Sequence, residues 1–378
     1  MIYCDYNATA PLRLEARKAM LTALDIGANP SSVHGEGRDA RRVVETARTS
    51  LANAIGGRAE DIVFTSGGTE ANALAIQGAL KLIPDAVVLW SDLEHSAVKG
   101  AIEASGAQQR KIKLTSEGIL DLDDLGNALE DLGGKTPFLC LMHANNETGI
   151  VQPVAEAARL VREKDGLVHC DAAQTLGKLK INVGLLGVDY MAFSAHKFGG
   201  PQGVGALWFR AGAPLKPIML GGGQERSLRS GTENVSGIGG FGAAIDVTAE
   251  LTGVERVQEI RDRFEALVEA SAPVTIFGKT SERLPGTSNL ALEGFKSETQ
   301  VMAMDLAGVA VSAGSACSSG KVRQSDVLTA MGVPDELAGS AIRVSFGWAS
   351  TLADSEKAAE SWLAAAKRAV PSAFKEST

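Results

Sequence analysis

The chain has 378 residues, of which 45% are hydrophobic and 22% charged, and its formal net charge is −8 at pH 7. This composition is ordinary for a globular protein, and the length favours two domains over one. The negative charge and the absence of a Lys/Arg run argue against nucleic acid as a direct partner, and no apolar run in the sequence approaches the length of a membrane span.

Two helices are expected first, over residues 12–25 and 36–55, because apolar residues recur there at helical spacing. Strands and helices then alternate, which predicts a mainly parallel sheet with helices on both faces. Short apolar segments predict the strands at residues 61–65, 86–90, 111–114, 137–142, 167–170, 188–193 and 204–209.

Beyond residue 210 a loop-rich stretch precedes a long helical segment, expected over roughly residues 240–270. Short strands and helices mix after residue 273. The hexapeptide at residues 237–242 matches G-x-G-x-x-G, but it follows a polar loop and not a strand. Close packing at the start of a helix is therefore expected there, and a dinucleotide site is not.

Polar residues follow several of the predicted strands. They include the Ser-Gly-Gly-Thr-Glu segment at residues 66–70, His95, Asn146, Asp171 and Gln174. Ligands of parallel α/β sheets bind at the carboxyl ends of the strands. The sequence thus predicts one polar site at that edge of the sheet.

Lys197 lies in a Gly-rich turn between two of the predicted core strands. Burial pushes a lysine toward its neutral form, and a neutral amine is what a Schiff base to an aldehyde cofactor requires. A lysine that caps a turn with its amine in water is an equal alternative for this segment taken alone.

Two further groups fit such a cofactor. The segment at residues 66–69 follows a strand and opens a helix, which makes an anion site, although Thr69 as an ordinary helix cap is the stronger reading of it alone. Asp171 ends an apolar strand and needs a cationic partner, and a protonated pyridine nitrogen would serve. A strand-end Asp that bonds the next turn is the common alternative.

The four cysteines are scattered, which suits a reducing cytoplasm, and the start of the chain lacks the pattern of a signal peptide. Cys140 and Cys170 lie in apolar strands and are expected to be inert; Cys4 stays open. Cys317 lies in a run of small polar residues, where a thiol is exposed and nucleophilic if it ionises. Arg343 interrupts an apolar strand and meets a carboxylate, of the protein or of a substrate.

Taken together, the chain resembles a cysteine desulfurase of the NifS/IscS type, in the class V aminotransferase family of fold-type I enzymes that use pyridoxal 5'-phosphate (PLP). The match runs nearly end to end, and the lysine and cysteine motifs are specific in combination. It rests on residues 5–11, 29–34, 65–70, 94–95, 145–149, 171–174, 194–197, 222–226, 229–232, 314–317 and 342–343.

The resemblance implies roles for these residues. Lys197 would bind PLP as a Schiff base, Asp171 would pair with the pyridine nitrogen, and Gln174 would contact the ring oxygen. His95 would stack on the ring and carry a proton for the substrate thiol, and Asn146 would lie beside the ring. The phosphate would be held by Gly68, Thr69, Ser194 and His196, with Thr232 contributed by the other subunit of a homodimer.

The implied reaction removes sulfur from L-cysteine, with Arg343 and Asn29 holding the substrate carboxylate. It gives L-alanine and a persulfide on Cys317, from which sulfur passes to an acceptor such as an iron–sulfur scaffold. The implied fold is α/β. A large domain, residues 13–252, would hold a seven-stranded sheet, and a smaller α+β domain, residues 253–378 with segment 1–12, would carry Cys317.

Two alternatives stay open. Another PLP enzyme of this family, such as a selenocysteine lyase or an aminotransferase, would not need Cys317 for ordinary amino-acid turnover. A non-enzymatic sulfur-relay scaffold would be expected to have lost Lys197 or Asp171, and both are present.

Overall fold

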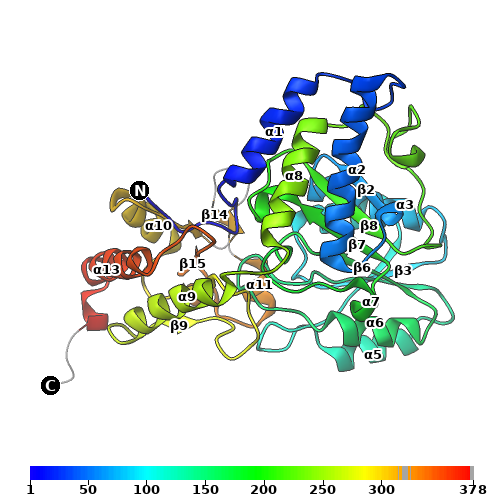
Figure 1. The fold of residues 1–378 in the computed structure, drawn as a ribbon. Coiled ribbons are helices and arrows are strands. Elements are labelled where there is room, and N and C mark those ends of the chain that lie inside the picture. The colour runs from blue at the N-terminus through cyan, green and yellow to red at the C-terminus, as the bar shows by residue number, and fades with distance from the viewer. Residues whose placement is uncertain (314, 317–321, 324, 375–378) are drawn as a thin grey trace.

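A seven-stranded sheet forms the centre of the larger part of the molecule (Figure 1). The structure is a computed structural model that describes residues 1–313, 315, 316, 322, 323 and 325–374. β8 runs antiparallel to its two neighbours, and the other neighbouring pairs are parallel. The order across the sheet is β2 (Ile62–Thr65), β8 (Gly205–Phe209), β7 (Tyr190–Ser194), β6 (Leu167–Asp171), β5 (Pro137–Cys140), β3 (Val87–Trp90) and β4 (Gln108–Lys111).

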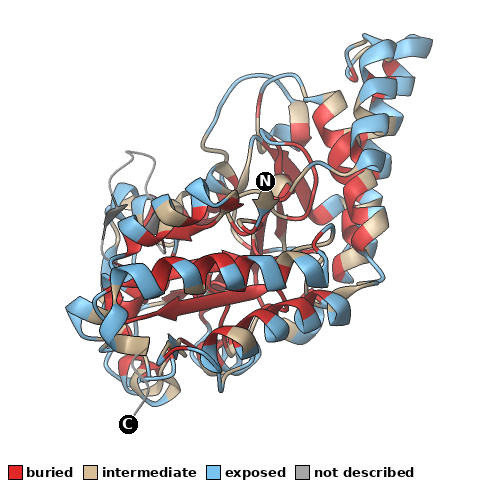
Figure 2. Cartoon of the chain, turned by 90° about the vertical axis from the view of Figure 1, so that its left-hand side faces the viewer, coloured by how far each residue is buried: buried red, intermediate tan, exposed pale blue. Residues whose placement is uncertain are grey.

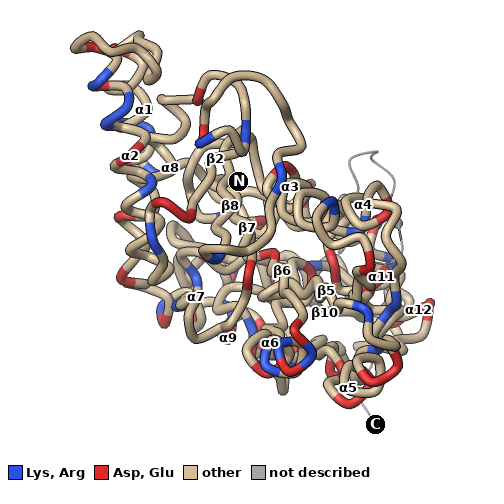
Figure 3. Tube along the Cα trace, turned by 90° about the vertical axis from the view of Figure 1, so that its right-hand side faces the viewer, with Lys and Arg blue, Asp and Glu red and all other residues tan. Residues whose placement is uncertain are grey.

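Helices cover both faces of this sheet, as the alternating pattern predicts. Their buried sides face the strands and their exposed sides face outward (Figure 2). Charged positions of both signs lie mostly on helices and loops and seldom on the central strands (Figure 3). The helices of this part are α1 (Leu14–Ile26), α2 (Gly35–Ile55), α3 (Gly68–Leu80), α4 (Ser96–Ser105), α5 (Leu122–Glu130), α6 (Val154–Arg162), α7 (Val183–Leu186) and α8 (Val235–Thr248).

A smaller sheet of four strands has its own hydrophobic core, which includes Cys4 from the start of the chain. The N-terminal strand β1 (Ile2–Tyr3) pairs with β11 (Val309–Ala310), so the first residues lie against this part (Figure 1). The small sheet has the order β12 (Ser312–Ala313), β15 (Ala341–Ser345), β10 (Thr287–Ala291) and β9 (Thr275–Ile276). The helices beside it are α9 (Val254–Glu269), α10 (Ser297–Leu306), α11 (Asp326–Ala330), α12 (Asp335–Ala338) and α13 (Leu352–Ala369).

Two predicted elements differ from the structure. The helical segment expected over residues 240–270 is two helices, α8 and α9, because Leu251 (φ 54°) and Gly253 (φ 86°) adopt the left-handed conformation between them. The strand expected over residues 111–114 instead ends at Lys111 as β4. It is an edge strand that pairs with β3 alone, so its polar residues stay in solvent and give no apolar signal.

The hexapeptide at residues 237–242 packs helices together, as expected. It lies in α8, where the glycines allow close approach of α1 and α2. A Cβ on Gly240 would lie 2.6 Å from Cγ of Met20, and one on Gly242 would lie 2.7 Å from Cβ of Ala47. The glycines are therefore required by helix packing.

Candidate active site

A cavity of about 720 Å³ opens at the carboxyl ends of the parallel strands, on the edge predicted from the sequence. It collects side chains that follow β3, β5, β6 and β7, together with the first turn of α3 and one strand of the small sheet. The predicted site residues that line it are Gly68, Thr69, His95, Asn146, Asp171, Gln174, Ser194, His196, Lys197 and Arg343.

The first turn of α3 forms one wall. Its N-cap is Gly67 and not Thr69, and no side chain caps the helix. Gly68 and Thr69 of this first turn line the cavity, and the first backbone N–H groups of a helix have no partner within it. A Cβ on Gly68 would lie 3.3 Å from Cβ of Ser194. The wall therefore offers donors and space suited to a phosphate group.

Asp171 lies at the end of β6 and is buried. Its Oδ1 accepts from the Ala173 backbone N–H at 2.9 Å, and its Oδ2 accepts from Nδ2 of Asn72 at 2.7 Å. These donors are neutral, so a cationic ring nitrogen in the cavity is a partner that suits this carboxylate.

Asn72 in turn is fixed from behind by His169. The Asn72 Oδ1 lies 2.9 Å from Nε2 of His169, so the imidazole donates from Nε2. Burial lowers the pKa of His169 to about 4, which keeps the ring neutral. Asp171, Asn72 and His169 form a chain of hydrogen bonds that holds the carboxylate in one orientation.

Lys197 lies in the short helical turn Ala195–Lys197 that joins β7 to β8, as expected. Its Nζ donates to the carbonyl oxygens of Asn7 and Ala8 at 2.8 and 2.9 Å. Burial, with the charge of Arg343 acting in the same direction, lowers the pKa of Lys197 to about 8. A lysine with this lowered pKa gives up its proton more readily than an ordinary lysine, which suits Schiff-base chemistry.

Asn7 connects the parts of this site, and sequence reasoning did not assign it a role. Its carbonyl accepts from Lys197 and also from Nε2 of Gln174 at 2.9 Å. Its side chain donates to the Asn146 carbonyl at 3.2 Å and to Oγ1 of Thr287 at 2.9 Å. One residue thus ties Lys197 to both sheets of the molecule.

Lys178 is a second lysine that the sequence analysis missed. Its Nζ donates to Oε1 of Gln174 at 2.8 Å and to Oδ1 of Asn7 at 3.2 Å. Burial lowers its pKa to about 7, and the charges of Lys197 and Arg343 act in the same direction. Its position one helical turn after Gln174 was the only signal available in the sequence.

Arg343 has the internal carboxylate partner considered for it, and its role toward a substrate stays a prediction. Its Nη2 pairs with Oδ1 of Asp5 at 2.7 Å and its Nη1 donates to the Asn146 carbonyl at 2.9 Å, so it has an internal partner. It also lines the cavity, and its buried Nε has no hydrogen-bond partner among the described residues. The guanidinium is therefore held rigidly, with donor capacity left over.

His95 caps the N-terminus of α4. Its Nδ1 accepts from the Ala97 backbone N–H at 3.1 Å, which leaves the hydrogen of the neutral ring on Nε2. Burial and the charges of Lys197 and Lys99 lower its pKa, with Asp171 opposing them. The ring is thus a neutral donor at the cavity.

The neighbouring Glu94 is fully buried and was not predicted. Its Oε1 accepts from the Met142 backbone N–H at 2.6 Å, while Oε2 has no partner among the described residues. Burial raises the pKa of Glu94 to about 8, so the carboxyl holds its proton at neutral pH.

Three of the predicted site residues are not brought to the cavity of this single chain. Asn29 and Thr232, both in the described part of the chain, are exposed and are not among the residues that line it. The Asn29 side chain instead accepts from the Ser31 backbone N–H at 2.8 Å. Cys317 lies outside the described residues. The roles given to these residues stay predictions.

The expected burial of two cysteines is confirmed. Cys140 and Cys170 are fully buried, and burial raises the pKa of each thiol well above its ordinary value. Cys4, left open by the sequence, is also buried, in the core of the small sheet. Inert thiols are the expected result of such burial.

The residues present fit PLP. The free N–H groups of α3 beside Gly68 suit its phosphate, buried Asp171 suits its ring nitrogen, and Lys197 with a lowered pKa suits its aldehyde. These groups line one cavity that has room for a cofactor of this size and an amino acid.

Comparison with known proteins agrees with this geometry. A model of the aminotransferase class-V family matches residues 2–357. Cysteine desulfurase IscS of Dictyoglomus turgidum is 42% identical over 362 residues, 93% of this chain and 91% of that protein. A cysteine desulfurase of Cereibacter sphaeroides is 40% identical over 369 residues, 95% of this chain and 94% of that protein.

Solved structures give the same assignment. A NifS-like protein superposes with a TM-score of 0.89 at 31% identity, and the match covers 96% of this chain and 98% of that one. A structure described as SspA in complex with cysteine has a TM-score of 0.80 at 30% identity, over 92% of this chain and 99% of that one. The chain therefore belongs to the aminotransferase class-V family and, within it, to the cysteine desulfurases.

Proposed function

We propose that this chain is the enzyme that removes sulfur from L-cysteine with PLP as cofactor, leaving L-alanine and a persulfide on Cys317. The observation that carries this proposal is the meeting of Lys197, Asp171, His95 and Arg343 in one cavity, in a chain that belongs to the cysteine desulfurases. PLP supplies an electron sink for bond changes at the amino-acid Cα when it is bound.

The residues of the chain position the substrate and move protons. The Arg343 guanidinium, fixed by Asp5, binds the carboxylate of cysteine. Lys197, whose pKa is lowered to about 8 mainly by burial, takes the Cα proton, and the carbonyls of Asn7 and Ala8 fix its direction. His95 faces the substrate thiol and carries a proton for it. Because Nδ1 of His95 accepts from the Ala97 backbone N–H, the proton of the ring is on Nε2, which is the nitrogen that donates.

Sulfur transfer also needs a nucleophile, and we assign this role to Cys317. The Cys317 thiolate attacks the sulfur of cysteine, an S–S bond forms, and the C–S bond breaks with its electron pair retained on Cβ. Protonation of that carbon gives alanine. The step is balanced without an external oxidant, since the sulfur moves from one thiol to another as a persulfide.

We extend the proposal to the assembly. The exposed position of Thr232, away from the cavity of its own chain, supports a homodimer in which Thr232 reaches the phosphate of the partner subunit. The separate cores of the two sheets support the domain division 13–252 and 253–378 with segment 1–12. A sulfur acceptor such as an iron–sulfur scaffold would then take the persulfide.

A cytoplasmic location is also part of the proposal. Cys4, Cys140 and Cys170 are buried and unpaired, which suits a reducing compartment. Among the described residues, no helix has both the length and the apolar character to cross a membrane.

The test is turnover of L-cysteine by the purified protein, with and without reductant, following alanine and sulfide. Cys317→Ala is the comparison variant, with an absorbance scan for bound PLP. Both products from the wild type, and neither from Cys317→Ala with its PLP band intact, would support the proposal. A PLP band without Cys317-dependent alanine would instead favour the selenocysteine lyase or aminotransferase alternative.

A further inference from the structure

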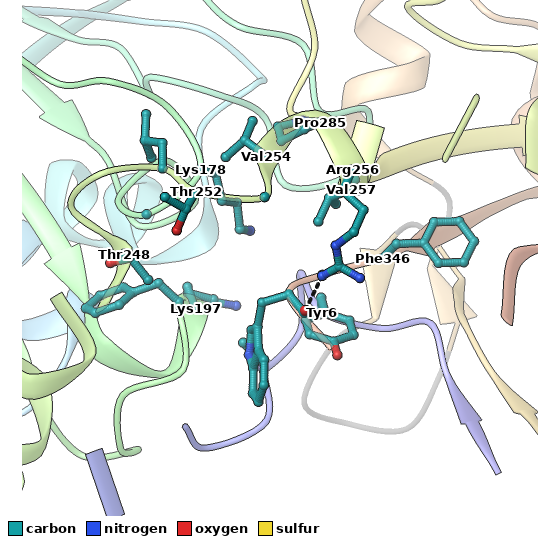
Figure 4. Close-up of a pocket in the computed structure, with 18 of the residues that line it drawn as sticks. Tyr6, Lys178, Lys197, Thr248, Thr252, Val254, Arg256, Val257, Pro285 and Phe346 are labelled. Atoms are coloured by element: carbon teal, nitrogen blue, oxygen red, sulfur yellow. Dashed lines mark hydrogen bonds between the residues drawn. The ribbon is translucent and has the colours of Figure 1, made fainter. Parts of the chain in front are cut away.

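A second cavity of about 180 Å³ lies where the two cores of the molecule meet, and we name it the junction cavity. It is lined by the segment that joins α8 to α9, by the N-terminal segment, and by the end of β15. Asn7 and Lys197 line both this cavity and the active-site cavity. Apart from these two residues the two cavities have different linings. Figure 4 shows the residues that line the junction cavity.

The charged side chains of the junction cavity all have one sign. Arg13, Lys178, Lys197 and Arg256 line it, and no Asp or Glu is found among the described residues that do so. Figure 4 shows the ammonium ends of Lys178 and Lys197 and the guanidinium of Arg256 directed toward its middle. An anion in this space would meet cationic groups from several sides.

These cations are bonded to neutral acceptors. Lys178 donates to Gln174 and Asn7, and Arg256 donates to the carbonyls of Trp348 and Ser350 at 2.6 and 2.7 Å. Nε of Arg13 donates to the Phe198 carbonyl at 3.1 Å. Carbonyl and amide oxygens carry no charge, so the guanidinium groups of Arg13 and Arg256 have no carboxylate partner among the residues that line the cavity. An anion beside Lys178 would favour the charged form of that amine. This arrangement favours a bound counter-anion.

The other walls are mainly apolar, with Asn7, Thr248, Thr252 and Thr287 as their polar members. They include Val254 and Val257 of α9, Phe346, and the rings of Tyr6 and Trp348. One water needs about 10–15 Å³ on this scale, so the cavity takes on the order of a dozen water-sized groups. A bare inorganic anion would leave these walls without contacts, whereas an apolar body of six to ten heavy atoms, a rough figure on the same scale, would fill them.

We propose that the junction cavity binds a small organic monocarboxylate with an apolar body, its carboxylate against Lys178 and Arg256 and its body against Val254 and Trp348. This site is distinct from the cysteine site, and the two cavities share only Asn7 and Lys197 among their lining residues. Because its lining comes from both cores and includes Lys197, an occupant links the two parts of the molecule beside the catalytic lysine.

The test is isothermal titration calorimetry on the PLP-loaded protein, with the cofactor in place so that its phosphate site is filled. Benzoate is the probe, benzamide is its neutral counterpart, and sulfate is an anion without an apolar body. We expect one benzoate per chain and at least about tenfold weaker binding of both controls, equivalent to about 1.4 kcal/mol.

Variants locate the site. Arg256→Gln is expected to weaken benzoate binding about tenfold, the usual loss for one charged hydrogen bond, and Arg256→Lys to restore part of it. Val254→Phe keeps the charges and fills the space, so it should abolish binding. Arg263→Gln is the matched control, because Arg263 lies on the same helix and pairs with Glu356 away from the cavity.

Circular dichroism and bound PLP show that each variant is folded. Equal binding of benzoate and benzamide, or unchanged benzoate binding in folded Val254→Phe, would overturn the proposal, as would no binding at millimolar benzoate. The readout does not involve turnover, so it is independent of the proposed reaction.

Discussion

Replacing Glu94 by Gln measures how much the ionisation of a buried carboxyl at the active site lowers the free energy of unfolding. The carboxyl is fully buried, Oε1 accepts from Met142 N–H, and Oε2 has no partner among the described residues. Gln keeps the shape and the Oε1 contact but cannot ionise. The substitution therefore removes the ionisable proton of residue 94 and leaves its contact with Met142 in place.

The magnitude follows from the two pKa values. The carboxyl has a pKa near 4.5 in the unfolded chain and about 8 in the fold. The folded protein thus binds the extra proton between these values, and stability falls as pH rises through that window. At about 1.36 kcal/mol for each pKa unit, the wild type should lose about 3 kcal/mol relative to Glu94→Gln between pH 5 and pH 8.

Urea unfolding of both proteins at fixed concentration, with equal PLP, measures this difference at each pH. Glu103→Gln is the control, because Glu103 is exposed on the neighbouring helix α4. Parallel stability curves for the wild type and Glu94→Gln from pH 5 to pH 8 would refute the reasoning, since they would mean that Glu94 ionises in the fold as it does in water.

Three further predictions follow from contacts described above. Asn72→Ala removes a donor to Asp171 and an acceptor of His169, so titration of the cofactor-free protein with PLP should show affinity at least about tenfold lower, and unchanged affinity would contradict the chain of hydrogen bonds. Lys178→Met should show the opposite pH dependence of stability, because the pKa of Lys178 is about 7 in the fold and 10.5 ordinarily. The free energy of unfolding of the wild type, relative to the variant, should therefore rise between pH 7 and pH 10.5 in the same urea assay. A difference that stays constant with pH would contradict the lowered pKa. Gly242→Ala should cost about 1–3 kcal/mol by crowding Ala47, whereas Gly126→Ala in helix α5, with open space at its Cβ, should gain about 0.5–1 kcal/mol. Thermal unfolding that ranks the two glycine variants the other way round would show that helix packing does not require Gly242.

The edge of the sheet on which the site lies was predictable because the signals are local. Each strand is a short apolar run, and the polar residue that ends it, such as Asp171, must lie at the carboxyl edge of a parallel sheet. Lys197 was placed correctly for the same reason, as a turn between two such runs. These inferences need no knowledge of distant contacts.

The network behind the site was not predictable, because its partners are far apart in sequence. Asn7 meets Lys197 and Gln174 only when the start of the chain folds against its middle, and no local pattern shows that its carbonyl accepts from both. The same holds for Asn72, whose role depends on His169. The break between α8 and α9 was missed because Leu251 gives no turn signal, although its backbone is left-handed.

The N-terminal segment has a consequence for biosynthesis. Asn7 supplies the carbonyl that orients Lys197, while its own backbone N–H donates to Oγ of Ser345, which is 338 positions away. A ribosome makes Asn7 at the start of translation, completes the last strand of the large sheet at Phe209, and makes Ser345 only near the end. The contact that holds Asn7 against the small sheet therefore forms after the large sheet has been made. A nascent chain that stalls before β15 would lack both this contact and Arg343.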